Sequence, residues 1–90
     1  MKVAFRVHGM VQGVGYRRFA AREAEQFGLS GWVRNEPDGA VSGEAEGPEA
    51  VLADFRAALT RGPGFAMVER LDWEALDVGT SCPFPFQIRR

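Results

Sequence analysis

The chain has 90 residues, of which 46% are hydrophobic and 26% are charged, as is ordinary for one globular domain. Its single cysteine, Cys82, excludes an internal disulfide and any multi-cysteine metal site. The net charge of −1 argues against general nucleic-acid binding, and no segment resembles a membrane span or a secretion leader, so we expect a single cytoplasmic domain over residues 1–90 without nucleic-acid or membrane partners.

The first part of the chain predicts a strand and a helix. Apolar and polar residues alternate through residues 2–9, which is the pattern of a half-buried strand. After a glycine-rich loop, apolar residues recur at three- and four-residue steps from Tyr16 to Phe27. This spacing predicts an amphipathic helix of about three turns, which Gly28 ends because glycine accepts a left-handed conformation.

Residues 30–47 predict a β-hairpin followed by a second helix. The turn of the hairpin is the sequence EPDG at 36–39, in which proline fixes φ and glycine accepts a positive φ. Pro48 is expected at the first position of the second helix, whose apolar stripe runs to Leu59. The sequence RGPG at 61–64 ends this helix.

Two further strands complete the prediction. The segment 66–73 has the composition of a strand, but Val68, Leu71 and Trp73 break strict alternation and indicate a β-bulge. The prolines of the segment 84–90 suit a short edge strand. The resulting order predicts an α+β, ferredoxin-like split βαββαβ sandwich, with a mainly antiparallel sheet, two helices on one face and a short C-terminal strand.

The loop GMVQGVGYRR at residues 9–18 carries the strongest chemical signal. Arg17 and Arg18 stand at the start of a helix, where a cation costs about 0.3–1 kcal/mol. An anion would resolve this conflict, because Gly13 and Gly15 let backbone N–H groups converge and Arg17 can close over the ligand with its planar fork of donors. The alternative is a plain connection with surface arginines.

The distribution of charge supports an anion-binding loop, and the sequence does not match three common phosphate-binding motifs. Residues 1–35 hold six basic and two acidic residues, a net charge of +4. A Walker loop fails because the only lysine is Lys2, and a dinucleotide-binding loop fails because Arg18 stands where a glycine is needed. A cysteine phosphatase fails because Ile88 stands where its arginine would follow Cys82.

Two motifs together resemble the acylphosphatase family. GMVQGVGYR at 9–17 resembles that family's signature G-x-V-Q-G-V-x-F/Y-R at every specified position. GWVRNEPDGAVSGEAEG at 31–47 resembles its second signature, with an asparagine at the expected interval, and the end of the chain is similar to the family's F-x-I-R. The resemblance extends over nearly all of the chain.

The resemblance implies metal-free and cofactor-free hydrolysis of carboxyl-phosphate mixed anhydrides. Arg17 matches the signature arginine, which would hold the phosphoryl oxygens, and Asn35 matches the asparagine, which would orient the attacking water. Backbone amides would complete the phosphate cradle, and they belong to Gln12, Gly13, Val14, Gly15, Tyr16 and Arg17. The expected partner is a small acyl phosphate or inorganic phosphate.

The few chemically active residues suit such a substrate. An acyl phosphate expels a carboxylate whose conjugate acid has a pKa near 4, about that of a glutamate side chain, so no general acid is needed. His8 lies on the polar face of the first strand, where a surface role is favoured over a catalytic one.

Two other functions remain open at this point. One is a phosphate- or carbamoyl-phosphate-binding module, such as the similar domain of hydrogenase-maturation carbamoyltransferases. The other is a ferredoxin-like RNA-binding domain, although no exposed aromatic strand motif for RNA is evident. We also expect a monomer, because the sequence indicates no large exposed apolar patch.

Overall fold

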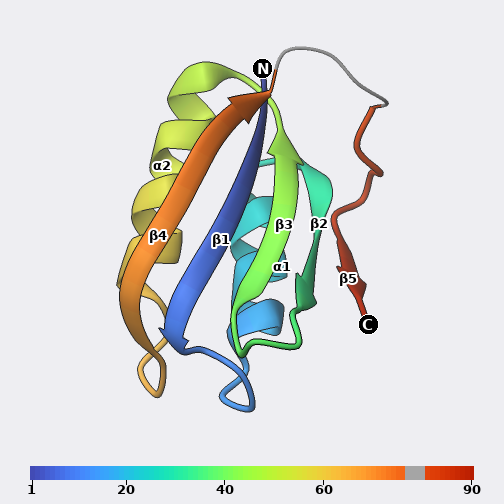
Figure 1. The fold of residues 1–90 in the computed structure, drawn as a ribbon. Helices are drawn as coiled ribbons and strands as arrows, with labels where there is room; N and C mark the ends of the chain where they lie inside the picture. The colour runs from blue at the N-terminus through green and yellow to red at the C-terminus, as the bar shows by residue number, and fades with distance from the viewer. Residues whose placement is uncertain (77–80) are drawn as a thin grey trace.

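The computed structural model describes residues 1–76 and 81–90. Its elements are β1 (Lys2–Met10), α1 (Tyr16–Gln26), β2 (Ser30–Asn35), β3 (Val41–Glu46), α2 (Glu49–Arg61), β4 (Met67–Leu76) and β5 (Gln87–Arg89). The strands form one sheet in the order β4-β1-β3-β2-β5, and only β2 and β5 pair in parallel. Figure 1 shows both helices on the same face of this sheet. The predicted ferredoxin-like fold is confirmed.

The core lies between the sheet and the two helices. The alternation in β1 buries Val3, Phe5 and Val7 on the helix side, while the intervening residues face the open side of the sheet. Phe5 meets the ring of Phe55 from α2 edge-to-face, with 5.8 Å between centroids. The pattern predicted for the first strand therefore accounts for the side of the sheet that the helices cover.

Both helices end as their glycines require, but α2 starts one residue later than expected. Gly28 has a φ of 70°, and the N–H groups of Gly28 and Leu29 bond back to the carbonyls of Glu25 and Ala24. Pro48 has a ψ of 145°, so it is the residue before the helix instead of its first turn. The fixed φ of proline is compatible with both positions, and ψ decides between them.

The predicted bulge is present in β4. Gly9 pairs with Val68 and His8 pairs with Arg70, which leaves Glu69 as an extra residue in the ladder. A Cβ at Gly9 would lie 2.1 Å from the carbonyl oxygen of Met67. The bulge therefore brings the two backbones close together just before the chain enters the glycine-rich loop.

Several large apolar side chains are exposed at one end of β1 and β4. Met10 and Met67 are cross-strand partners and are 63% and 60% exposed, and Phe65, two residues before Met67, is 90% exposed. The monomeric state stays a prediction. No described helix is long and apolar enough to cross a membrane.

We predict that Gly43→Ala destabilises the fold by about 1–3 kcal/mol, because it overpacks the core. A Cβ at this position in β3 would lie 2.6 Å from Cζ of Phe5 and 2.1 Å from the carbonyl oxygen of Trp32. Urea unfolding measures the change. Gly64→Ala is the matched control, since a Cβ there meets nothing within 4 Å. Equal stability of the two variants would contradict the packing described for β3.

Candidate functional site

A pocket of about 260 Å³ lies where β1 and β2 end and α1 begins. It brings together five residues that the sequence places in the site, namely Gly13, Gly15, Tyr16, Arg17 and Asn35. The remaining lining residues are Val11, Arg18 and Ile88. The two sequence motifs, about twenty residues apart in the chain, thus meet at one end of the sheet.

The backbone of the loop is shaped by two glycines. Gly13 and Gly15 have φ values of 76° and 79°, in the left-handed region that favours glycine. A Cβ at either position would meet nothing within 4 Å, so conformation and not space requires glycine there. Gly15 is also the N-cap of α1 and offers no side-chain cap to the helix.

This conformation leaves a run of backbone donors without partners. The N–H groups of residues 12–18 donate no hydrogen bond to any other described residue, and the first intrahelical bond of α1 joins Phe19 N–H to the Gly15 carbonyl at 3.0 Å. The first turn of α1 contains no acidic residue that could take these donors. The loop and helix start therefore present donors and partial positive charge together, which favours an anion.

The side chains between and beside the two glycines attach the loop to the rest of the fold. Tyr16 is buried, and its hydroxyl donates to the carbonyl of Leu59 in α2 at 2.5 Å; burial raises the pKa of this phenol, so it stays protonated. Val14 packs against the core. Gln12 donates to the hairpin that follows β2. Gln12 and Val14, which the sequence also places in the site, are not among the residues that line the pocket.

The guanidinium of Arg17 is held by the C-terminal strand. Its Nη1 donates to the carbonyl oxygen of Arg89 at 3.1 Å, and β5 reaches this position because it pairs in parallel with β2. Arg18 lines the same pocket, and no carboxylate does. The described lining therefore has two cations with no opposing negative charge, which attracts an anionic ligand.

Asn35 is the last residue of β2 and lies at the pocket wall. Its Oδ1 atom is buried and has no hydrogen-bond partner among the described residues. A buried acceptor without a donor is costly, so its place at the edge of a positive pocket points to a donor supplied by a ligand or a water. A role for Asn35 in forming the hairpin turn alone would not account for this unpaired oxygen.

The turn after Asn35 is held from the open face of the sheet. Ser42 and Arg34 both donate to the Glu36 carboxylate, the latter at 2.8 Å, and together they keep its pKa below the usual value. Arg6 donates to Asp38 at 2.8 Å and likewise lowers the pKa of that carboxyl. These contacts fix the hairpin immediately beside Asn35.

The sequence analysis missed three pocket residues. Val11 lies within the first motif but was not assigned to the site, and Arg18 directly follows the motif and was considered for its place in the helix dipole and in excluding a dinucleotide-binding loop. Ile88 lies two residues before the end of the chain and is 48% exposed. Its alternation with other apolar residues predicted a strand, but no local pattern indicates that this strand would pair beside β2.

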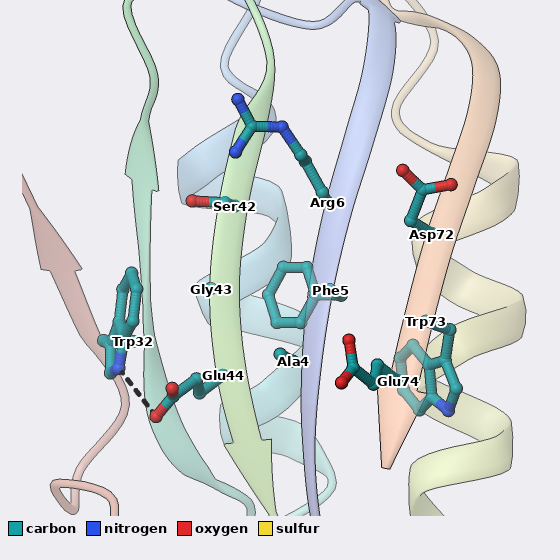
Figure 2. A pocket seen from close by; sticks show the side chains of 10 residues that line it. All are labelled: Ala4, Phe5, Arg6, Trp32, Ser42, Gly43, Glu44, Asp72, Trp73 and Glu74. Atoms are coloured by element: carbon teal, nitrogen blue, oxygen red, sulfur yellow. Dashed lines mark hydrogen bonds between the residues drawn. The ribbon is translucent and has the colours of Figure 1, made fainter. Parts of the chain in front are cut away.

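A second hollow, of about 370 Å³, lies on the open face of the sheet (Figure 2). Trp32 stands on one side of it and Asp72 and Glu74 on the other, with Ala4 between them. Its lining has three carboxylates, the third from Glu44, against one guanidinium, so it does not suit a phosphate.

His8 and the metal-ligating residue types take no part in the candidate site. The Nε2 atom of His8 lies 3.0 Å from a carboxylate oxygen of Asp72 on the open face, and the histidine does not line the pocket. Within residues 1–76 and 81–90, no three His, Cys, Asp or Glu side chains are grouped as a metal site would require.

The chain is similar to known proteins over nearly its whole length. The family model described as Acylphosphatase matches residues 3–84. An acylphosphatase from Salinibacter ruber is 43% identical over 89 residues, which is 99% of this chain and 93% of that protein. The crystal structure of acylphosphatase from Bacillus subtilis is 37% identical with a TM-score of 0.89, and the match covers 99% of this chain and 98% of that one.

A larger protein also contains a similar domain. The crystal structure of T. kodakarensis HypF is 30% identical to this chain with a TM-score of 0.85. The match covers 99% of this chain but 12% of that protein. The similarity is therefore to one part of a longer polypeptide.

We predict that the hairpin contacts make the protein less stable in acid. The pKa of Glu36 is lowered in the folded state, so the unfolded chain takes up a proton more readily, and the free energy of unfolding falls as the pH drops below about 5. Glu36→Gln, which keeps an acceptor but cannot titrate, should flatten this decline in urea unfolding between about pH 6 and pH 3.

Glu25→Gln is the control for this experiment, because its exposed carboxylate has no hydrogen bond or ion pair with the described residues. It should keep the wild-type slope. An identical pH dependence in wild type and Glu36→Gln would show that the Glu36 carboxylate does not stabilise the turn.

Proposed function

This chain belongs to the acylphosphatase family and is a hydrolase, and we propose that it cleaves acyl phosphates by in-line attack of water on a phosphoryl group held by the loop of residues 12–17. The observation that carries this proposal is the run of unpaired backbone N–H groups in the loop, next to a pocket lined by Arg17 and Arg18. The products would be a carboxylate and inorganic phosphate.

Binding of the phosphoryl group would rest on the loop amides and Arg17. The amides can donate to several oxygens at once, and the planar guanidinium can donate two parallel bonds to the same group. These donors also face the charge that develops on the equatorial oxygens in the transition state, where fixed donors contribute most to catalysis. The bond from Arg17 to the Arg89 carbonyl holds the guanidinium in place before substrate arrives.

Activation of water is assigned to Asn35. Its buried Oδ1 can accept a hydrogen bond from the water and so fix the direction from which the water approaches phosphorus. A water that is already held in place does not have to be ordered during the reaction, so the entropy cost of that ordering is removed from the barrier. Asn35 has no basic group, so the proton would pass to the substrate phosphate.

The leaving group explains why the pocket needs no acid. A carboxylate leaves without being protonated, because its conjugate acid has a pKa near 4. The described lining accordingly has no Asp, Glu or His side chain. A phosphate monoester would expel a far more basic alkoxide, and the pocket offers no described proton donor for it.

The direct test is hydrolysis of benzoyl phosphate in the presence of EDTA, with an alkyl phosphate monoester as the comparison. We expect rapid cleavage of benzoyl phosphate alone. Phosphate binding without turnover would instead favour the phosphate-binding module. Cleavage of the monoester or a requirement for added metal would contradict the proposal.

We predict that Arg17→Ala lowers turnover of benzoyl phosphate by about 10³-fold or more, the size of effect seen for arginines in phosphoryl transfer. Arg17→Lys should recover little, because an ammonium group cannot reproduce two parallel bonds. Steady-state kinetics measures both. Arg22→Ala serves as the control, since Arg22 is exposed on α1 and does not line the pocket. Wild-type turnover in Arg17→Ala would refute the assignment.

Asn35→Ala is expected to lower turnover by roughly 10²-fold while competitive inhibition by inorganic phosphate stays near the wild-type value, because the loop still binds the anion. The inhibition constant for phosphate is measured alongside kcat. If phosphate inhibition is lost together with turnover, Asn35 binds the phosphoryl group and does not position water.

A further inference from the structure

We infer that Gln12 is a positioning residue, whose side chain fixes Asn35 relative to the phosphate loop. The family signature places this glutamine in the loop, and the sequence analysis assigned it only a backbone amide. The inference rests on the proposed function of Asn35 and adds a residue that acts through it.

The contacts of the Gln12 side chain carry this inference. Its half-buried Nε2 atom donates to the carbonyl oxygen of Glu36 at 2.8 Å and to that of Ala40 at 2.9 Å. Both partners are carbonyls, which can only accept, so the amide orientation with nitrogen toward the hairpin is fixed by chemistry. One nitrogen therefore ties the loop to both ends of the turn.

The two carbonyls belong to residues next to Asn35 and next to its cross-strand partner. Glu36 follows Asn35 directly in the chain, and Ala40 precedes Val41, the cross-strand partner of Asn35. The turn is also closed by the Glu36 N–H, which donates to the Ala40 carbonyl at 2.8 Å. A displacement of Gln12 would therefore release the backbone that follows Asn35 and the backbone that leads into its cross-strand partner.

The topology explains why the loop needs a side-chain connection to the hairpin. The loop follows β1 and Asn35 ends β2, but β3 lies between these two strands in the sheet. The partners of Gln12 are 24 and 28 residues away in sequence, and the loop contains two left-handed glycines that do not constrain it. Among the described residues, Gln12 has the only side chain that joins the loop to the hairpin by hydrogen bonds.

Glutamine is suited to this position by its donors. Its primary amide carries two N–H groups on one nitrogen, which match the two carbonyls. In Gln12→Glu, a carboxylate of nearly the same size would meet the same two carbonyls with no donor, so the hairpin and the loop would separate. Gln12→Met removes the donors without adding charge and is the second variant.

We expect Gln12→Glu and Gln12→Met to lower kcat for benzoyl phosphate by roughly 10- to 100-fold, since small misplacements of a reacting group have effects of this size. KM and the inhibition constant for phosphate should change by less than about twofold, because the loop amides and Arg17 remain. Gln26→Glu makes the same chemical change at an exposed position of α1 and should match wild type.

A double-mutant cycle separates positioning from a general structural role. In an Asn35→Ala background, Gln12→Glu should cause less than about a twofold further loss, because the water it would help to place is no longer held. A loss equal to that in the wild-type background would overturn the inference, as would a parallel loss of phosphate inhibition. Circular dichroism and thermal unfolding show whether each variant is folded. If Gln12→Glu does not fold, the same cycle with Gln12→Met tests the inference.

The outcome also distinguishes this inference from the proposed function. If wild type cleaves benzoyl phosphate and Asn35→Ala does not, the proposed function stands. An unchanged kcat in both Gln12 variants would then reject only the positioning role of Gln12. If wild type shows no cleavage, the proposed function itself fails.

Discussion

The site depends on backbone N–H groups that the loop and first turn of α1 leave unpaired. A helix start always has such donors, but most helices satisfy them with a capping side chain or an acidic first turn. Here the N-cap is Gly15 and the first turn holds Tyr16, Arg17 and Arg18, so positive charge is added where it is least favoured. Under the proposed function, this arrangement would stabilise a bound anion, and it destabilises the helix when no anion is bound.

Rigid anchors make a glycine-rich loop usable as a cradle. Each side chain between or beside the glycines reaches a different part of the fold: Gln12 the hairpin, Val14 the core, and Tyr16 the end of α2. Backbone freedom at Gly13 and Gly15 thus permits the curved conformation without leaving the loop loose. The donors can then be held in place before the ligand binds, which reduces the ordering cost on binding.

Local patterns in the sequence were sufficient for the fold. The break in alternation at Val68 and Leu71 predicted the bulge, because the extra residue of a bulge interrupts the apolar-polar alternation along its strand. The same reading could not find the bonds from Gln12, which join residues 24 and 28 positions apart, or the place of Ile88, which depends on parallel pairing with β2. Contacts between residues far apart in the chain do not produce a periodic pattern in the sequence. The sequence therefore predicted the motif residues of the candidate site, but not the hydrogen bonds and strand pairing that hold them in position.

A titration of the ¹⁵N-labelled protein with inorganic phosphate, followed by NMR, tests the central claim most directly. The account predicts that the largest shifts fall on the backbone amides of residues 13–18 and on the guanidinium of Arg17. Shifts concentrated on the open face, around Trp32 and Glu74, with the loop amides unmoved, would contradict it.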